Sequence, residues 1–351
     1  ADIQLVALAA LADIMPMKDE NRVFVNSGIS SIKENHARKG LAELLSKMNI
    51  TKDSINSTTL AWTIIPSLNA AGRLGQSNLS LELLISEDSK KREELAETIF
   101  QLNEKRKKLV SEAEFSASKK AQDSLEKYEN KLSVIIDNNI HRGITGIVAT
   151  KFMQNFNVPS IVITSSDDNC IGSMRSCRGF IATEFLSNFS DILTSFGGHD
   201  YAAGFNFKAN QLENFITKLN SLVPSISMNS SEDIINIDAE IPEQYLEPSV
   251  FNILDTFEPY GNENEKLCFL SCKLKLISAE LFGKKNPMHL KLIFDCGKYK
   301  IPAIYWNSGD RLNNDIAINE KYDIIYELNK KYYNGLTTNQ LEVINMVKSE
   351  S

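Results

Sequence analysis

Two segments of the sequence carry groups that suit a phosphate. In GSMRS, Ser173 and Ser176 supply hydroxyl donors and Arg175 supplies a guanidinium group. Because side chains alternate along a strand, we expect Ser173 and Arg175 on one face, where both can reach one cluster of phosphate oxygens. In SFGGHDYAAGF, which we expect to form a short turn, Gly197 and Gly198 leave backbone N–H groups uncovered. The imidazole of His199 can donate to a phosphate or ribose oxygen.

Two further segments add positive charge. NAAGRLG places Arg73 in a predicted loop whose glycines allow close backbone approach. HRGITGIVA places His141 and Arg142 immediately before a predicted helix, where the helix N-terminus favours an anion. Each of the four segments, judged alone, is more often structural than functional. Together they predict an anion-binding site.

Composition limits the class of protein. The 351 residues are 42% hydrophobic and 24% charged, with a net charge of −7. This sign argues against a protein that coats nucleic acid non-specifically, so the anion site must be local. No apolar run is long enough to predict a membrane span. The cysteines are odd in number and never spaced C-x-x-C, which argues against a disulfide framework or a zinc site and favours a reducing cytoplasm.

The N-terminal part predicts helices. ADIQLVALAALADIMPM is apolar on nearly every side and stops near Pro16, as expected of a buried helix. It begins without a start methionine, and we expect the chain to begin inside a longer protein. Residues 26–50 predict one or two amphipathic helices, and residues 64–88 an apolar run, a loop and a short helix.

Residues 89–130 predict one long helix, which would connect two domains or, as the alternative, form a solvated coiled-coil arm. The segment lacks glycine and proline, and Leu95, Ile99, Leu102, Leu109 and Ala113 form a narrow apolar stripe. At 1.5 Å per residue, about 40 residues would extend about 60 Å.

The remainder predicts an α/β domain and then a barrel. LSVIID, GITGIVATKFMQNF and PSIVIT form a strand, a helix and a strand, and further strands and helices follow to about residue 223. We expect residues 235–254 to pack back onto this domain. Five strand-like runs after FEPYGNENEKLCF predict a small closed barrel such as an OB-fold.

In this order the segments resemble the RecJ family of single-strand-specific exonucleases, in the DHH phosphoesterase superfamily. The matching segments are VALAALADIMPMKDENR, NAAGRLG, HRGITGIVA, GSMRS, FGGHDYAAGF, FEPYGNENEKLCF and YDIIYELNKKYYNGLTTNQLEVI. The resemblance implies an α/β multidomain fold. Its parts would be a remnant of the DHH domain (1–88), the connecting helix (89–130), a DHH-associated domain (131–257) and an OB-fold domain (258–351).

The resemblance also implies roles for residues. His199 would contact the scissile or terminal phosphate, and Arg73, Ser173 and Arg175 would hold a 5′ phosphate. The remaining phosphate-binding candidates are Ser176, Gly197, Gly198 and His141. The barrel would guide single-stranded DNA, with Tyr260, Phe269, Tyr299 and Trp306 as candidate stacking rings.

The implied reaction is hydrolysis of a phosphodiester by water held between two Mn²⁺ or Mg²⁺ ions. The chain departs from the family here, because only one metal-ligand motif is present, in LADIMP, with Asp13 as its carboxylate. One carboxylate does not hold two ions, so we expect the chain alone to be inactive. Thr145 and SCRGF are smaller departures, and we expect neither to touch a phosphate donor.

Partners follow from the same resemblance. It implies a cytoplasmic monomer that acts 5′→3′ on 5′-phosphorylated single strands in repair and recombination, with a helicase and a single-strand-binding protein nearby. The alternatives are a non-catalytic strand-binding module, a short DHH-family oligoribonuclease or cyclic-dinucleotide phosphodiesterase, and a structural α/β protein with coincidental motifs. The long helix and the barrel speak against the short phosphodiesterase.

Overall fold

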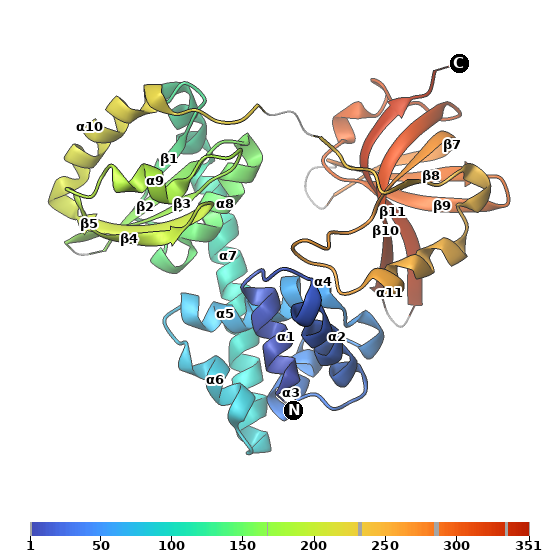
Figure 1. Cartoon of the computed structure of the whole chain (residues 1–351), viewed down its shortest axis with the longest axis horizontal. Helices are drawn as coiled ribbons and strands as arrows, with labels where there is room; N and C mark the ends of the chain where they lie inside the picture. The colour runs from blue at the N-terminus through green and yellow to red at the C-terminus, as the bar shows by residue number, and fades with distance from the viewer. Residues whose placement is uncertain (1, 167, 231–233, 284–287, 334–335, 351) are drawn as a thin grey trace. The chain divides into compact units, whose positions relative to one another are not determined.

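The structure is a computed structural model that describes every residue except 1, 167, 231–233, 284–287, 334–335 and 351. The chain forms two compact units (Figure 1). The helix–barrel unit contains Ala1–Ile65 and Ile234–Ser351, and the sheet unit contains Pro66–Asp233.

The helical part of the sheet unit is organised around one long helix. Its helices are α5 (Ile65–Arg73), α6 (Asn78–Ile85) and α7 (Ser89–Lys127). The Asp88 side chain accepts hydrogen bonds from the backbone N–H groups of Lys90 and Lys91, at 2.9 and 3.2 Å, and so caps α7. The predicted connecting helix is confirmed, and Figure 1 shows α7 running from α5 and α6 to the sheet.

The sheet has five strands in the order β1-β2-β3-β5-β4. The strands are β1 (Ser133–Ile136), β2 (Ser160–Ser166), β3 (Asn169–Arg175), β4 (Leu193–His199) and β5 (Ala202–Lys208). The helices among them are α8 (Thr145–Phe156), α9 (Ala182–Ser187) and α10 (Leu212–Leu222). β1 and β2 are parallel and joined through α8, as predicted, and the other pairs are antiparallel.

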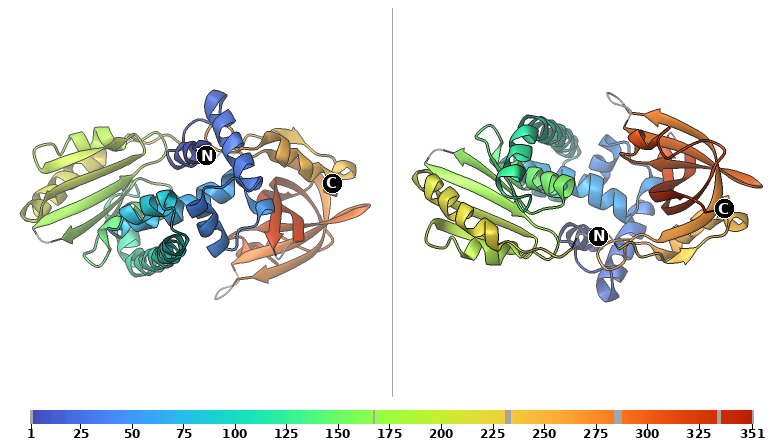
Figure 2. Two further views of the ribbon diagram at one scale, coloured as in Figure 1. Left: turned by 90° about the horizontal axis from the view of Figure 1, so that it is seen from below. Right: turned by 90° about the horizontal axis from the view of Figure 1, so that it is seen from above.

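The two faces of this sheet differ. One face packs against α9 and α10 through a phenylalanine cluster made of Phe185, Phe189, Phe205, Phe207 and Phe215. α7 and α8 cover the β1–β2 half of the other face, around Ile135 and Val162. Figure 2 shows the sheet between the yellow α10 and the teal α7. On that second face, β5 and β4 carry exposed residues such as Gly204 and Asn206, so half of the face stays open.

The helix–barrel unit begins with α1 (Ile3–Ala12), α2 (Asp19–Lys33) and α3 (Lys39–Lys47), followed by a short α4 (Ser57–Thr59). Gly28 of α2 lets the helices approach, because a Cβ there would lie 2.4 Å from the Cβ of Ala7. The buried Gln4 donates to the Ser31 hydroxyl and accepts from the Arg38 backbone N–H, at 2.9 and 2.8 Å. The predicted helices at the N-terminus are therefore confirmed.

The barrel follows in the same unit, after the short α11 (Ile253–Phe257). Its strands are β7 (Cys268–Phe282), β8 (His289–Cys296), β9 (Tyr299–Tyr305), β10 (Lys321–Tyr333) and β11 (Leu336–Lys348). β10 pairs with both β11 and β7, which closes the ring β7-β8-β9-β11-β10. The predicted five-strand barrel is confirmed.

The expectation that residues 235–254 pack onto the α/β domain is wrong. Ile241, Leu246 and Phe251 lie in the barrel core, and β6 (Ala239–Glu240) pairs with β7. The buried apolar residues of this segment therefore belong to the barrel core. The barrel also contacts the N-terminal helices, since the Met17 backbone N–H donates to the Asn262 carbonyl at 2.7 Å.

Candidate phosphate-binding site

The predicted face of GSMRS is confirmed. In β3, Cys170, Gly172 and Met174 are buried beneath the strand, while Ser173 and Arg175 lie together on the opposite, half-open face. Ser173 is paired with Gly204, and Arg175 with Ala202, both on β5. The two phosphate candidates therefore stand beside a floor of very small side chains, which lets a ligand come close to the backbone.

Helix α8 closes one side of this face through residues that the sequence analysis did not select. A Cβ on Gly146 would lie 2.7 Å from Nη2 of Arg175, so a larger residue there would displace the guanidinium group from its present position. The buried Thr145 hydroxyl lies 2.9 Å from the Ser173 hydroxyl. Our expectation that Thr145 touches no phosphate donor is wrong, because the helix start packs directly on β3.

Arg73 approaches the same helix start. It is the last residue of α5 and does not lie in a loop as predicted, because the helical pattern continues through NAAGR. Its Nη1 donates to the Gly143 carbonyl at 3.3 Å. A Cβ on Gly143 would lie 1.8 Å from the Arg73 carbonyl oxygen. Gly143 therefore allows the end of α5 to contact the loop before α8.

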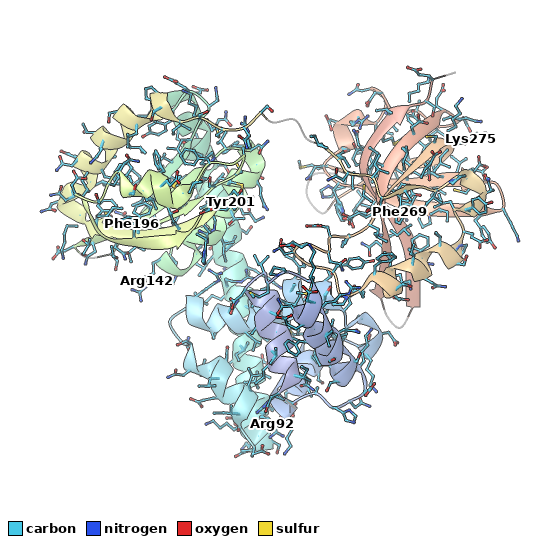
Figure 3. All side chains as sticks on the ribbon, viewed as in Figure 1. Arg92, Arg142, Phe196, Tyr201, Phe269 and Lys275 are labelled. Atoms are coloured by element: carbon cyan, nitrogen blue, oxygen red, sulfur yellow. The ribbon has the colours of Figure 1, made fainter. Side chains whose placement is uncertain are left out.

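An open pocket forms where these segments meet. It is lined by Gly72, Arg73, Leu74, Gly75, His141, Arg142, Gly143 and Ile171. His141 and Arg142 are exposed, as expected of residues ahead of a helix, and Nδ1 of His141 accepts from the Gly143 backbone N–H at 3.1 Å. Arg142 projects from the sheet unit (Figure 3). Arg73 and His141 thus line the same pocket.

A third arginine, Arg106 of α7, belongs to the same group. Burial lowers the pKa of Arg73, although that side chain keeps exposed surface, because other atoms crowd its guanidinium group. Burial, and then the charge of Arg73, lower the pKa of both Arg106 and Arg175. Among the described residues, no carboxylate forms an ion pair with any of the three. The three-arginine cluster thus concentrates positive charge without an internal counter-ion.

His199 lies at the end of an edge strand. Gly197, Gly198 and His199 belong to β4, and the predicted turn is displaced to Asp200 and Tyr201, because the glycines pair with β5. His199 is exposed and pairs with Ala202, which pairs in turn with Arg175. Two strand spacings, about 10 Å, separate the backbones of His199 and Arg175.

Gly197 and Gly198 play different parts in this strand. Gly198 has a φ of +149°, and a Cβ there would lie 2.2 Å from the Ala202 carbonyl oxygen. A Cβ on Gly197 would meet no atom within 4 Å. Gly198 is therefore required by the fold, whereas Gly197 only keeps the surface flat. Phe196 and Tyr201, both exposed, flank this strand end (Figure 3).

Two predicted site residues lie outside this group. Ser176 is buried, and its hydroxyl donates to the Phe180 carbonyl. Asp13, the candidate metal ligand, is exposed at the C-terminal end of α1 in the other unit. In the described part of the chain, no group of three or more His, Cys, Asp or Glu side chains could hold a metal ion. The residues present do not fit a two-ion cluster.

The barrel carries one exposed aromatic cluster. Trp306 is 44% exposed and lies against His289 and Phe282, with ring centroids 4.9 and 5.7 Å away. Its indole N–H donates to Glu342 at 2.6 Å, which fixes the ring. Of the other stacking candidates, Tyr299 is half-buried.

Two of the stacking candidates are excluded by burial. Phe269 lies within the barrel core (Figure 3). Tyr260 is buried, and its hydroxyl donates to the Leu254 carbonyl at 3.1 Å. Neither ring can stack on a base, because alternation along β7 and the tight PYGNEN turn direct them inward.

The sheet unit and the barrel each match a known domain family. Residues 129–224 match the model of the DHHA1 domain, and residues 237–345 match the model of the RecJ OB domain. The second match begins where residues 235–254 join the barrel core.

None of the helices in the described part of the chain combines the length and the apolar character that a membrane span needs.

Comparison with individual proteins extends the similarity to nearly the whole chain. The single-stranded-DNA-specific exonuclease RecJ of Bacillus subtilis is 30% identical over 99% of this chain and 44% of its own length. That of Thermus thermophilus is 26% identical over 99% of this chain and 48% of its own length. The chain thus spans about half the length of these curated relatives.

Solved structures agree in fold. A crystal structure of RecJ from Thermus thermophilus in complex with Mn²⁺ matches with a TM-score of 0.81 at 25% identity, over 99% of this chain and 50% of that one. A second, in complex with Mg²⁺, matches with a TM-score of 0.78 over 99% and 52%. The predicted combination of a DHH-associated domain, a long helix and an OB-fold is confirmed.

Proposed function

The chain belongs to the RecJ family, and from this we propose that it holds the 5′-phosphorylated end of single-stranded DNA for a 5′→3′ exonuclease. The relatives are named as single-stranded-DNA-specific exonucleases. We propose the same activity for the intact protein.

The three-arginine cluster is the observation that carries this proposal. Arg73, Arg106 and Arg175 repel one another, and burial deprives them of part of their hydration. A terminal phosphate carries close to two negative charges at neutral pH, whereas an internal phosphodiester carries one. The cluster therefore favours a strand end over the middle of a strand.

The open sheet face supplies the remaining contacts. Ser173 offers a hydroxyl beside Arg175, and the flat floor of Gly204 and Gly197 lets a sugar–phosphate backbone approach the sheet. We propose that His199 contacts a second phosphate. The backbones of His199 and Arg175 lie about two strand spacings, or about 10 Å, apart, so we expect the two side chains to contact different phosphates.

A complete metal site would need ligands that the described residues of this chain do not supply. Mn²⁺ and Mg²⁺ are bound by the similar Thermus proteins. A two-ion site would polarise the scissile phosphate and activate water, and Asp13 would contribute one carboxylate to it. Because the described residues contain no further cluster of ligands, we propose that the chain alone binds DNA without cutting it.

We propose that the barrel also contacts the single strand. Trp306 and the adjoining His289 offer a ring surface on which bases can stack, whatever their sequence. We propose four functional parts as in the sequence analysis, with residues 237–257 assigned to the barrel. The expected helicase and single-strand-binding partners remain predictions.

Binding of a labelled oligonucleotide tests the proposal directly. The chain is titrated against one single-stranded 20-mer prepared with a 5′ phosphate or with a 5′ hydroxyl, and with the duplex as control. We expect tighter binding of the 5′-phosphorylated single strand. Equal affinity for both strand ends would contradict the assignment of the arginine cluster to a terminal phosphate.

Activity is measured on the same strands, and on a dinucleotide, with Mn²⁺ added. We expect no release of mononucleotides, because the ligands are incomplete. Release from long strands would contradict our expectation of an inactive chain. Hydrolysis restricted to dinucleotides would instead favour the short-phosphodiesterase alternative.

A further inference from the structure

Tyr201 is a large aromatic side chain that the fold leaves in contact with solvent. It lies in the turn between β4 and β5, at the end of the sheet (Figure 3), and it is 58% exposed. Single exposed aromatic residues are common on protein surfaces, so exposure alone indicates no site. Tyr201 differs from such residues in how its backbone is held and in what lies on either side of it.

The turn that carries Tyr201 is braced by the segment between β3 and α9. The Tyr201 carbonyl accepts a hydrogen bond from the backbone N–H of Ser176, which follows β3 directly, at 2.9 Å. The Asp200 carbonyl accepts one from the backbone N–H of Ala182, the first residue of α9, at 2.7 Å. The buried Ser176 hydroxyl donates in turn to the Phe180 carbonyl. The ring therefore stands on an anchored backbone, and binding has only two side-chain torsions to order.

Tyr201 also lies between the two proposed phosphate contacts. It immediately precedes β5, whose first residue, Ala202, pairs with Arg175 of β3 on one side and with His199 of β4 on the other. The backbone of Ala202 is thus about one strand spacing, or about 5 Å, from each of these two residues. A strand whose phosphates bind Arg175 and His199 would pass over the end of β5, where its base meets only the methyl group of Ala202 and the ring of Tyr201.

The chemistry of the ring suits a nucleobase. Bases stack on tyrosine whatever their sequence, because every base has a π-face, and cations beside such rings hold the phosphates. In the described part of the chain, the Tyr201 hydroxyl has no hydrogen-bond partner, so the polar end of the side chain is also left to solvent. An anchored, exposed ring between two phosphate contacts is the arrangement that a single strand needs.

We propose that Tyr201 is a base-stacking residue, whose ring stacks on a base of the strand between the phosphates held by Arg175 and His199. This inference rests on the proposed binding of a 5′-phosphorylated strand end. It adds a contact to a base, whereas Arg175 and His199 contact phosphates.

The first experiment measures the affinity of the full chain for a 5′-phosphorylated single strand. Y201A should weaken binding roughly fivefold or more, because it removes one stacking contact. Y201F and Y201W keep an aromatic ring and should bind nearly as the unmodified chain does. Y201L keeps apolar bulk without a ring, so it should lose most of what Y201A loses. Y245A is the matched control, because Tyr245 is 64% exposed in the helix–barrel unit, and it should bind unchanged.

The second experiment identifies the base. The same strand is prepared with an abasic nucleotide at each position near the 5′ end in turn. At one of these positions, loss of the base should weaken binding by the unmodified chain and leave binding by Y201A unchanged, because the partner of the missing base is already absent. At positions further along the strand, loss of the base should affect both proteins equally. Thermal unfolding of each variant accompanies the binding measurements.

The outcomes separate this inference from the proposed function. If the unmodified chain binds 5′-phosphorylated and 5′-hydroxyl strands equally, both fail. If it prefers the phosphorylated strand, but folded Y201A binds that strand as tightly as the unmodified chain, only this inference is overturned. Y201F that binds as weakly as Y201A would also overturn it, since the hydroxyl would then make the contact.

The supporting result has two parts. Binding falls in Y201A and Y201L but not in Y201F, Y201W or Y245A, and the effect of Y201A disappears when one base near the 5′ end is removed. A loss in Y201A that persists whichever base is removed would overturn the stacking contact. Y201L carries both experiments should Y201A not fold.

Discussion

An arginine of the barrel and an arginine of the sheet unit have opposite surroundings. In the barrel, Arg311 donates from Nε to Asp315 at 2.9 Å and from Nη1 to the Tyr305 hydroxyl at 2.7 Å, and Asp315 raises its pKa. In the sheet unit, Arg175 donates to the carbonyl of the preceding residue, and burial and Arg73 lower its pKa.

The difference distinguishes an arginine whose charge is neutralised inside the protein from arginines whose charge is not. The first kind stabilises the fold, and the second kind is available to bind an anion. All three groups of Arg311 donors have acceptors inside the barrel, so its charge already contributes to stability. The three-arginine cluster has carbonyl and amide acceptors only, so its mutual repulsion persists until an anion binds. A carboxylate placed there would relieve the repulsion, but it would also compete with phosphate.

The largest expected effect comes from exchanging one arginine of each kind. R175A should weaken binding of the 5′-phosphorylated strand by about 1.5–3 kcal/mol, or roughly 10- to 150-fold, and should change binding of the 5′-hydroxyl strand much less. R311A should leave the ratio of the two affinities unchanged, but destabilise the barrel by about 1–3 kcal/mol in denaturant unfolding. Equal losses on both strands in R175A would remove the distinction between the two kinds.

Two glycines of the sheet unit allow a second comparison, between a glycine that packing requires and a glycine that lies on the open face. G143A should destabilise the sheet unit by about 1–3 kcal/mol, because its Cβ would lie 1.8 Å from the Arg73 carbonyl oxygen. G197A should leave the unfolding midpoint unchanged, because its Cβ meets no atom within 4 Å. It should nevertheless weaken strand binding, since the added methyl group stands on the proposed contact face. Unchanged strand binding by G197A would contradict the proposal that DNA contacts the open sheet face at Gly197.

The contact between Thr145 and Ser173 can be tested for whether it orients the Ser173 hydroxyl. T145V removes one partner of a buried hydroxyl pair and should cost about 1 kcal/mol of stability. T150V is the control, because Thr150 is half-buried and only donates to the Gly146 carbonyl of its own helix. Weaker binding by T145V than by T150V would show that the contact orients Ser173. Identical behaviour of the two variants would assign it to packing alone.

The smallest expected effect is on the pH dependence of stability, and it concerns the Arg311–Asp315 pair of the barrel. Hydrogen bonding to Arg311 lowers the pKa of Asp315 below its usual value. A carboxylate whose pKa is lowered by folding stabilises the protein above its unfolded pKa and loses that contribution as the pH falls through the folded pKa. D315N should therefore flatten the loss of stability on acidification slightly, and less at high salt, because Asp315 is largely exposed. An unchanged acid profile would mean that the pair contributes nothing measurable.

The spacing of apolar residues predicted the helices and strands well, but it did not predict against which core or strand each of them packs. The stripe of α7 and the five barrel strands follow from spacing that any packed helix or strand must show. The assignment of residues 235–254 failed because an apolar pattern indicates burial without indicating the core that receives it. The turn expected at Gly197 failed because strand pairing with β5 overrides the local preference of glycine.

Residue spacing likewise predicted only part of the candidate site. Ser173 and Arg175 were found because alternation fixes their common face. Gly143 and Gly146 act only through what a Cβ would displace, which spacing cannot reveal. Arg106 did leave a signal, as the gap in the apolar stripe between Leu102 and Leu109, but a charged residue in a charged helix attracts no notice until its neighbours are known.

The continuity of α7 limits how this part of the gene can change in length. Each residue inserted in an α-helix turns everything after it by about 100° and advances it by about 1.5 Å. One extra residue between Arg106 and Val110 would rotate the buried stripe beyond it away from the core around α8. Even an insertion of seven residues, which nearly restores direction, would shift that stripe by about 10 Å. Substitutions on the exposed side of α7 can therefore accumulate among relatives, while insertions and deletions in this stretch should be rare.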